Sequence, residues 1–264
     1  MISWLSEHCA NLRKDAARRK AARPEAELSS LIAQQNAEQG APRPFTQALH
    51  REDRIAIIAE VKFRSPSEGQ LRPIADVEHV AASYEASGAS ALSVLIDEVH
   101  FGGRLEYLSR ARKATRLPAI AKGFLVDPYD VMEARAFGAD AVLLIASCLE
   151  RTELADMHAL AQELGMAALV ELHSEADFRK VEGLDLPLVG VNHRDLDTLK
   201  MDMALSEELA SRLPAASTRV AESGIQTPAD LARMKALGYH AVLVGTRFMK
   251  HSDPGQELSK ILLG

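Results

Sequence analysis

The sequence predicts an α/β protein, a (β/α)8 TIM barrel with an N-terminal helical extension. Short runs rich in Val, Leu and Ile recur eight times after residue 54, and amphipathic stretches separate most of them. Parallel strands need helical crossovers, and eight strand–helix units close into a barrel. The length of 264 residues fits one barrel domain. A doubly wound open sheet is the alternative, but it usually has fewer strands, and no Gly-x-Gly-x-x-Gly motif follows any run.

Residues 1–50 differ from the rest of the chain and predict the extension. Lys and Arg cluster there between Ala and Leu, which indicates one or two amphipathic helices, with Pro24 at a helix start. The basic face could bind an anion or a partner, but a solvated helix face is the simpler interpretation. Pro42 and Pro44 predict an extended link, since a proline disfavours the α region for its predecessor. We therefore expect residues 1–50 to pack on a barrel of residues 51–264.

The expected strands and helices alternate from residue 55 onward. Buried parallel strands read as short apolar runs, which occur at 55–61, 91–95, 118–122, 140–145, 167–171, 187–191, 218–222 and 241–244. Examples of the stretches that predict helices are 74–87, 128–137, 152–164, 174–181, 206–213 and 228–237. Asp127-Pro128 and Thr227-Pro228 are typical helix starts. Glycines typical of left-handed helix ends follow several stretches, at Gly88, Gly138, Gly165, Gly183 and Gly238.

The composition bounds the partners and the compartment. The 31 basic and 37 acidic residues give a net charge of −6, which argues against nucleic acid or an anionic membrane as a partner. Cys9 and Cys148 have no metal-binding or CxxC spacing and are interpreted as reduced thiols. No apolar run approaches the ~20 residues of a membrane span, and the N-terminus lacks a signal-peptide core. We expect a cytoplasmic protein that is a monomer or a weak homodimer.

The first predicted strand ends in two charges. Glu60 and Lys62 are two residues apart and therefore share one face of the strand, beside a turn rich in Ser, Pro and Gly. Ionised groups are costly to bury unless they are paired. Two interpretations follow: a Glu60–Lys62 ion pair that closes the strand, or part of an active site.

Polar side chains also end most of the other strands. In this barrel, active sites are built at the carboxyl ends of the strands. Polar groups at so many ends are hard to explain by packing, and we expect perturbed pKa values among them. The groups are Lys122 with Phe124, Glu171, Asn192 with Arg194, Glu222-Ser223-Gly224 and Gly245-Thr246, while the fourth strand contributes apolar Leu143 and Ile145.

Two of these strand ends predict a phosphate site. Ser223-Gly224 follows the seventh run and Gly245-Thr246 follows the eighth. In this fold the corresponding loops often bind phosphate through backbone N–H groups and a short helix N-terminus. Ser65 could donate to the same group. The alternative is that both glycines only make tight turns.

The same motifs resemble those of the indole-3-glycerol phosphate synthase family. They follow the family's order and spacing from the N-terminal extension to the last strand. The matching segments are Pro44-Phe45, Glu60-Val61-Lys62, Ser65-Pro66-Ser67, Phe101-Gly102-Gly103, Lys122 with Phe124, Leu169-Val170-Glu171, Gly190-Val191-Asn192 with Arg194, Glu222-Ser223-Gly224-Ile225 and Val244-Gly245-Thr246.

The resemblance implies a ring closure in tryptophan biosynthesis, from 1-(2-carboxyphenylamino)-1-deoxyribulose 5-phosphate to indole-3-glycerol phosphate, CO2 and water. A carbonyl must be protonated as an arene carbon attacks it, a carboxylate must leave and a hydroxyl must be lost. This chemistry calls for ammonium acids and a carboxylate that exchanges protons. The expected partner is this phosphorylated small molecule. No organic cofactor or metal is expected, and no His, Cys or Asp cluster in the sequence suggests one.

The resemblance also implies residue roles. Lys122 would be the acid of the condensation, Lys62 would bind the substrate carboxylate or serve as a later acid, and Glu171 would act in the dehydration. The remaining implied roles are orientation of the lysines by Glu60, positioning of substrate hydroxyls by Asn192 and Ser223, binding of the aryl carboxylate by Arg194, an apolar wall from Phe124 and Leu143, and phosphate binding at Ser65, Gly224, Gly245 and Thr246.

The sequence departs from the family pattern near the expected site. Gly123 stands where Asp is usual, Arg104 where Ser is usual, Ile96 where Thr is common and His193 where a small polar residue is usual. If the usual Asp supports the Lys122 ammonium, Gly123 should slow the reaction and Gly123→Asp should raise kcat. If Arg104 or His193 has re-paired around the missing Asp, the same reversion should lower activity and melting temperature. A divergent paralogue that acts on a related aryl-amino sugar phosphate is one alternative function, and a non-catalytic barrel that binds a phosphorylated ligand is another.

Overall fold

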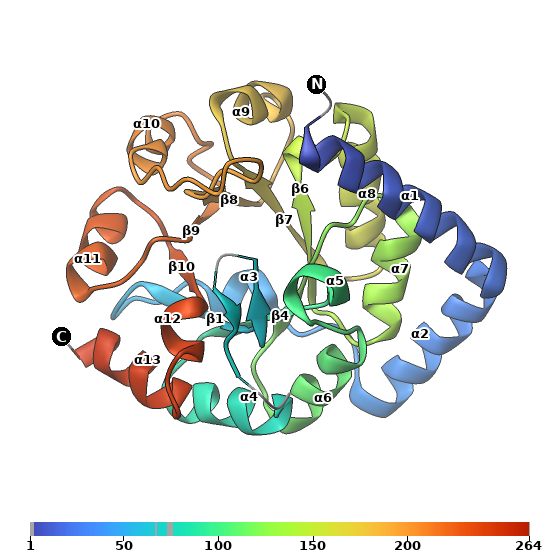
Figure 1. Cartoon of the computed structure of the whole chain (residues 1–264), viewed down its shortest axis with the longest axis horizontal. Coiled ribbons are helices and arrows are strands. Elements are labelled where there is room, and N and C mark those ends of the chain that lie inside the picture. The colour runs from blue at the N-terminus through green and yellow to red at the C-terminus, as the bar shows by residue number, and fades with distance from the viewer. Residues whose placement is uncertain (1–2, 67, 73–75, 264) are drawn as a thin grey trace.

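Eight parallel strands close into a barrel in the computed structural model of the chain, which describes residues 3–66, 68–72 and 76–263 (Figure 1). Each strand pairs with the next along the chain, and the last pairs back to the first. The predicted barrel is confirmed, and each predicted run agrees with its strand to within one residue at either end. The barrel strands are β1 (Ala56–Val61), β4 (Ala91–Leu95), β5 (Ala119–Lys122), β6 (Ala141–Ile145), β7 (Ala167–Leu172), β8 (Leu188–Asn192), β9 (Thr218–Glu222) and β10 (Ala241–Val244).

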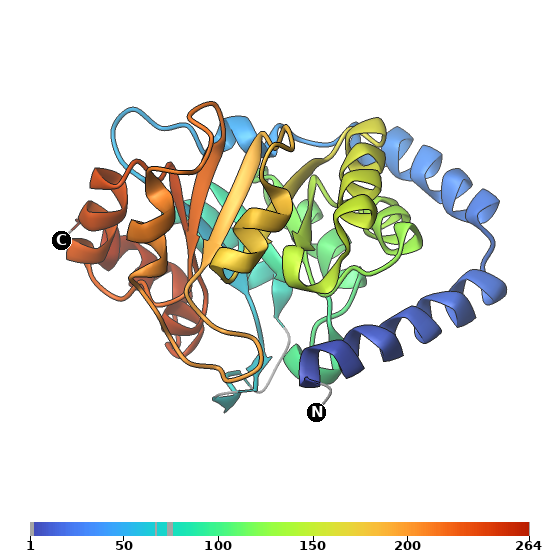
Figure 2. The same cartoon turned by 90° about the horizontal axis from the view of Figure 1, so that it is seen from above.

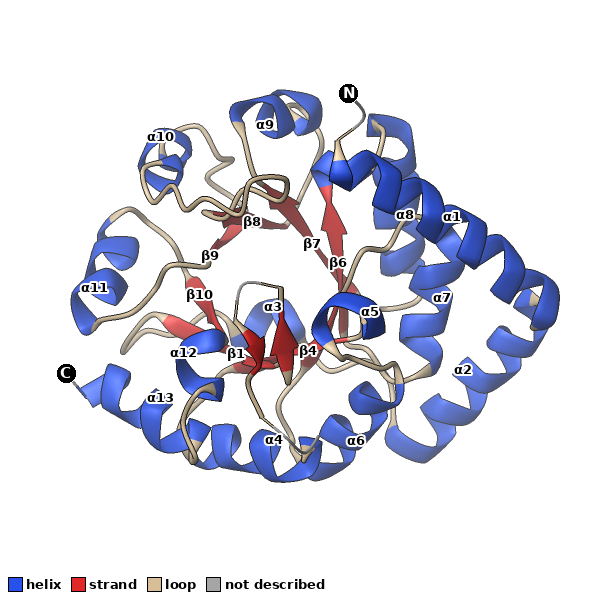
Figure 3. Cartoon of the chain, in the orientation of Figure 1, coloured by secondary structure: helices blue, strands red, loops and turns tan. Residues whose placement is uncertain are grey.

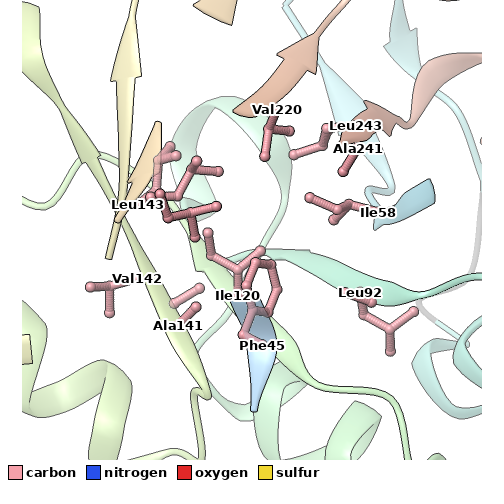
Figure 4. Packing of buried hydrophobic residues seen from close by; sticks show 14 of the residues in the cluster. Phe45, Ile58, Leu92, Ile120, Ala141, Val142, Leu143, Val220, Ala241 and Leu243 are labelled. Atoms are coloured by element: carbon pink, nitrogen blue, oxygen red, sulfur yellow. The ribbon is translucent and has the colours of Figure 1, made fainter. Parts of the chain in front are cut away.

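The barrel strands are buried on both faces, which is why they read as continuous apolar runs in the sequence. Ile58 of β1 pairs in register with Leu243 of β10 on one side and with Ala91 of β4 on the other. Figure 4 shows the apolar side chains of several strands gathered in this core, Ile120 and Leu143 among them. Burying one large aliphatic side chain contributes about 1.5–3 kcal/mol, so the core holds the strand ends in place.

Helices cover the outside of the barrel (Figure 3). The predicted helix starts are confirmed, because Asp127 and Thr227 both form capping boxes with a proline in the first turn. The predicted glycine helix ends are confirmed as well, with φ values between 77° and 93° at Gly88, Gly138, Gly165, Gly183 and Gly238. The outer helices are α4 (Val77–Ala86), α6 (Glu106–Ala114), α7 (Pro128–Ala136), α8 (Arg151–Glu163), α9 (Glu175–Val181), α10 (Leu205–Ala210), α11 (Pro228–Ala236) and α13 (Pro254–Leu263).

The N-terminal residues form α1 (Trp4–Ala22), α2 (Glu25–Gln39) and α3 (Phe45–Ala48). Helix α2 packs on α7, and α1 contacts both α7 and the short 3-10 helix η1 (Ala146–Cys148). Arg19, from the basic face of α1, pairs with Asp130 at 2.7 Å and with Glu133, both on α7. Part of the basic face is therefore not solvated but docks the extension on the barrel. Figure 2 shows α1 toward one end of the barrel and α3 at the other.

Short elements that the sequence did not predict lie over the carboxyl ends of the strands. They are the hairpin of β2 (Arg64–Ser65) and β3 (Gly69–Gln70), α5 (Glu98–Phe101) and α12 (Thr246–Met249). The predicted helix at 74–87 begins at Val77 in the described part of the chain, and its first two positions, like Ser67, lie outside the described residues. None of the helices that the structure describes is long and apolar enough to cross a membrane.

Candidate active site

A pocket opens at the carboxyl ends of the barrel strands. Side chains from each of the barrel strands or the loops that follow them line it, and Trp4 from the start of α1 closes one side. The barrel thus brings together every candidate site residue that the sequence predicted: Glu60, Lys62, Ser65, Lys122, Phe124, Leu143, Glu171, Asn192, Arg194, Ser223, Gly224, Gly245 and Thr246.

Glu60 and Lys62 form an ion pair inside the pocket. Lys62 Nζ lies 2.5 Å from Glu60 Oε2, and both side chains are largely buried. The backbone carbonyl of Glu60 accepts a hydrogen bond from the buried hydroxyl of Tyr84, which fixes the end of β1. The two interpretations of this pair are compatible, because the ion pair lies in the pocket wall and its ammonium group faces the space available to a ligand.

Lys122 lies at the centre of the charged part of the pocket. Its Nζ donates to Glu171 Oε2 at 2.8 Å and to Glu222 Oε2 at 3.0 Å, so β5, β7 and β9 meet at one ammonium group. Burial alone would lower the pKa of Lys122, but the carboxylates around it outweigh burial and raise the pKa above its ordinary value. The side chain therefore carries a proton at neutral pH.

Glu171 is held in its charged form by two cationic partners. Burial disfavours the carboxylate, but Lys122 and His173 outweigh this cost and hold the pKa of Glu171 well below its ordinary value. His173 Nε2 lies 2.7 Å from Glu171 Oε1, and its Nδ1 donates to the carbonyl of Arg194 at 2.7 Å. Burial lowers the pKa of His173, but the Glu171 charge raises it by more, and the ring supports Glu171 through their direct contact.

Glu222 is a second buried acid beside Lys122, and no role for it was predicted from the sequence. Burial and the nearby Glu171 charge raise the pKa of Glu222 well above its ordinary value. Its Oε1 is buried and finds no partner among the described residues. A Cβ atom at Gly190 would overlap this oxygen, so Gly190 provides the room for the carboxyl group. The signal was present in the sequence, since Glu222 ends a strand in the same way as Glu171 does.

The loops after β9 and β10 also line the pocket. Ser223 and Gly224 have φ values of 67° and 76°, and the left-handed region is unusual for a serine. The Ser223 carbonyl accepts a hydrogen bond from His193 Nδ1 at 2.8 Å, which holds this turn. Thr246 begins α12. Ser65 follows β1, the neighbour of β10 in the barrel, and its Oγ is buried and has no hydrogen-bond partner in the described part of the chain.

Apolar side chains line the rest of the pocket. Phe124 and Leu143, predicted from their strands, lie there together with Ile145. Trp4 also lines the pocket and contacts Phe124 edge-on, with 6.2 Å between the ring centroids. The contribution of Trp4 could not be predicted from the sequence, because this residue is more than a hundred positions from Phe124 and precedes the barrel.

The family model described as indole-3-glycerol phosphate synthase matches residues 5–261. The chain belongs to the indole-3-glycerol phosphate synthase family. A relative of that name from Leifsonia xyli subsp. xyli is 44% identical over 259 residues, which cover 98% of either chain. Another from Azoarcus sp. is 45% identical over 263 residues, again 98% of either chain, and one from Rhodospirillum rubrum is 42% identical over 266 residues, 99% of this chain and 100% of the relative.

A solved structure titled 3-hexulose-6-phosphate synthase matches with a TM-score of 0.61 at 14% identity. The match covers 78% of this chain and 98% of the other. At this identity the likeness supports the barrel fold alone.

The positions that depart from the usual indole-3-glycerol phosphate synthase pattern have identifiable surroundings. A Cβ atom at Gly123 would lie 2.7 Å from Ile96 Cγ1, so Ile96 occupies the space beside Gly123. Arg104 pairs with Glu98 at 3.2 Å on the surface. His193 Nδ1 donates to the Ser223 carbonyl, and its Nε2 accepts from the Ser206 hydroxyl at 2.6 Å. Neither Arg104 nor His193 has re-paired around the missing Asp.

Proposed function

We propose that the chain converts 1-(2-carboxyphenylamino)-1-deoxyribulose 5-phosphate to indole-3-glycerol phosphate, CO2 and water, with Lys122 as the general acid of the first step. The observation that carries the proposal is the position of Lys122 Nζ, which lies between Glu171 and Glu222 on the pocket wall. The two carboxyl groups keep the ammonium group protonated and hold it in one place. General acid catalysis contributes about 10²–10⁴-fold, and it requires such a fixed donor.

The first step forms a carbon–carbon bond. The arene carbon that bears the carboxylate attacks the ribulose carbonyl carbon, while the carbonyl oxygen takes a proton from Lys122. The developing alkoxide is more basic than an amine, so the transfer is favourable even though the pKa of Lys122 is raised. The adjacent ammonium charge stabilises the same oxygen in the transition state. CO2 then leaves, and its bonding electron pair restores the aromatic ring.

The second step removes water. The hydroxyl formed from the carbonyl leaves with a proton from an ammonium group, and a neighbouring carbon loses a proton to a carboxylate, which creates the double bond of the indole. Lys62 is the second ammonium group in the pocket and serves as this acid. Glu171 serves as the base, because its lowered pKa keeps it ionised and able to accept a proton. One proton is given and one is accepted, so the step balances.

The remaining pocket residues bind the two ends of the substrate. The loops carrying Gly224 and Gly245 bind the phosphate with backbone N–H groups, and the Ser65 hydroxyl, which has no hydrogen-bond partner among the described residues, donates to the same group. Asn192 and Ser223 position the substrate hydroxyls. Phe124 and Leu143 contact the anthranilate ring, and Arg194, whose guanidinium also donates to the Leu199 carbonyl, binds the aryl carboxylate.

The test is the appearance of indole fluorescence when the purified chain meets the anilino-deoxyribulose phosphate. Lys122→Met is the matched variant, since it keeps the length of the side chain and removes the charge. We expect a loss of about 10²–10⁴-fold in kcat with a nearly unchanged KM. A wild-type chain that forms no indole overturns the proposed function. A Lys122→Met chain that keeps more than about a tenth of kcat leaves the function in place but assigns the acid elsewhere.

A further inference from the structure

Three side chains that are distant in the sequence meet beside the pocket. His8 lies on α1, while Asp97 and His100 lie at the start of α5, in the segment that follows β4. One ligand atom from each of the three lies within 4.8 Å of the others. All three side chains line a groove between α1 and the barrel, which provides a route to the cluster from solvent.

We propose that His8, Asp97 and His100 bind a divalent transition-metal ion of the Zn²⁺ type, which fastens α1 to the α5 segment beside the pocket. Two imidazoles and one carboxylate form a ligand set that suits Zn²⁺ and related ions. The ion is not part of the ring-closing chemistry, and no step of that reaction passes through it. The groove leaves a fourth position open to water.

The distances are close to those that a metal ion needs. Asp97 Oδ2 lies 3.4 Å from His100 Nδ1 and 3.8 Å from His8 Nε2. Around a tetrahedral Zn²⁺ ion with bonds of about 2.0–2.1 Å, neighbouring ligand atoms are about 3.3–3.5 Å apart. The Asp97–His100 edge already has this length. The edges that involve His8 are longer, up to 4.8 Å, so the His8 ring has to move inward to complete the site.

The surroundings orient the three ligands without the ion. Asp97 Oδ1 accepts a hydrogen bond of 2.7 Å from the His100 backbone N–H, which leaves Oδ2 directed at the two rings. The His8 ring is stacked on Trp4 with 4.9 Å between centroids, and Phe124 contacts it edge-on at 4.8 Å. Groups that orient the ligands in this way contribute about 10–100-fold to metal affinity.

His8 also has a nitrogen that the protein leaves without a partner. Its Nε2 is buried and makes no hydrogen bond to any described residue. A buried nitrogen of this kind is costly unless a further group meets it. A metal ion binds such a nitrogen through the lone pair of the neutral imidazole. A metal ion satisfies the nitrogen and the Asp97 charge together.

The site has a direct consequence for the pocket. Trp4 stacks on His8 and lines the pocket, and His100 and Phe124 line it as well. An ion at the cluster would hold the first turn of α1 and the Trp4 ring against the barrel. The ion is thus a structural support for one wall of the pocket.

The experiment is a titration of the metal-stripped full chain with Zn²⁺ and with Co²⁺. Trp4 is the single tryptophan of the chain and lies against the cluster, so its fluorescence reports binding directly. We expect one Zn²⁺ per chain by elemental analysis, quenching of Trp4 by Co²⁺ and reversal of the quenching by Zn²⁺. His8→Gln and Asp97→Asn should each weaken binding by at least about tenfold, the lower value for loss of a supporting group.

The matched control is His158→Gln, which removes a buried histidine on α8, away from the cluster, and should leave the affinity unchanged. Asp97→Asn retains a side chain that caps α5, so it tests the site even if His8→Gln unfolds. Circular dichroism confirms the fold of each variant. The proposal is overturned if less than one ion binds per chain, or if wild type, Asp97→Asn and His158→Gln bind the ion with equal affinity. The three side chains would then make only ion-pair and ring contacts with one another.

Discussion

The carboxylate of Glu60 fills the space that a side chain at Gly245 would occupy. A Cβ atom at Gly245 would overlap Glu60 Oε2 and lie 2.8 Å from Cδ of the same carboxylate. The φ value of Gly245 is negative, at −130°, so no left-handed conformation is involved, and the constraint that the structure shows is the lack of room beside Glu60. Gly245 therefore serves the Glu60–Lys62 pair as well as the proposed phosphate loop.

We predict that Gly245→Ala lowers kcat by about 10²-fold, because the methyl group displaces Glu60 and with it Lys62, and small misplacements of reacting groups have effects of this size. Glu60→Asp shortens the side chain by one methylene and so makes room for the methyl group. The double variant Gly245→Ala, Glu60→Asp should therefore recover part of the lost kcat, which steady-state kinetics on the two single variants and the double variant would measure. Additive losses would contradict the overlap. Gly245→Asp would be a poor test of phosphate binding, because its Cβ atom would overlap Glu60 as well.

The two carboxyl groups on Lys122 should respond differently to the same substitution. The pKa of Glu171 is held well below its ordinary value by Lys122 and His173, whereas burial raises the pKa of Glu222 well above its ordinary value, so of the two carboxyl groups Glu222 takes up a proton first. Glutamine resembles a protonated glutamic acid in shape and charge. We predict that Glu171→Gln lowers kcat by about 10²–10⁴-fold, whereas Glu222→Gln stays within a factor of about ten. Equal losses in the two variants would show that the proton is not held on Glu222.

The raised pKa of Glu222 also predicts how stability depends on pH. A carboxyl group whose pKa is higher in the folded chain contributes stability that is present in full below its unfolded pKa and is lost as pH rises through its folded pKa. Glu222→Gln cannot ionise. In thermal melts between about pH 5 and about pH 9, the melting temperature of Glu222→Gln should therefore rise relative to that of the wild type as pH rises. The expected change is about 2–4 °C for each kcal/mol of difference in the free energy of unfolding. Parallel melting curves would contradict the raised pKa.

The sequence was sufficient for the barrel and for the strand ends because both depend on local patterns. Lys122 and Glu171 could be placed at the same end of the barrel, since parallel strands share the direction of their carboxyl ends. Which carboxyl groups contact Lys122 could not be predicted. That choice depends on the register of β5, β7 and β9 and on the room left by Gly190, and neither has a signature in one strand.

The contribution of α1 to the pocket was beyond prediction for a different reason. Trp4 and His8 reach the barrel only through tertiary packing, and the Arg19 contact with Asp130 joins helices more than a hundred residues apart. The cluster of His8 with Asp97 and His100 could not be predicted either, because His8 is far in the sequence from the other two residues. Metal-binding spacing is visible in a sequence only when the ligands lie on one element or neighbouring turns.

The last prediction concerns Gly123 and its neighbour Ile96. The usual Asp was expected to support Lys122, and its absence to loosen the acid. The structure does not support this reasoning, because Glu171 and Glu222 hold the Lys122 ammonium without help from position 123. A Cβ atom at Gly123 would lie 2.7 Å from Ile96 Cγ1 and 3.3 Å from its Cδ1, so a larger side chain cannot be added unless Ile96 moves.

We therefore predict that Gly123→Asp alone lowers both kcat and the melting temperature, since overpacking of this kind costs about 1–3 kcal/mol. Replacing Ile96 by Thr, the residue common in the family, removes the δ-methyl group and offers a hydroxyl to the new carboxylate. The double variant Ile96→Thr, Gly123→Asp should recover the melting temperature of the wild type, while Ile96→Thr alone should destabilise the chain because it leaves a cavity. Thermal melts of the three variants test this prediction, and independent effects on the melting temperature would mean that positions 96 and 123 do not share one space. A raised kcat in Gly123→Asp would instead support the hypothesis that Gly123 leaves the Lys122 acid loosely held.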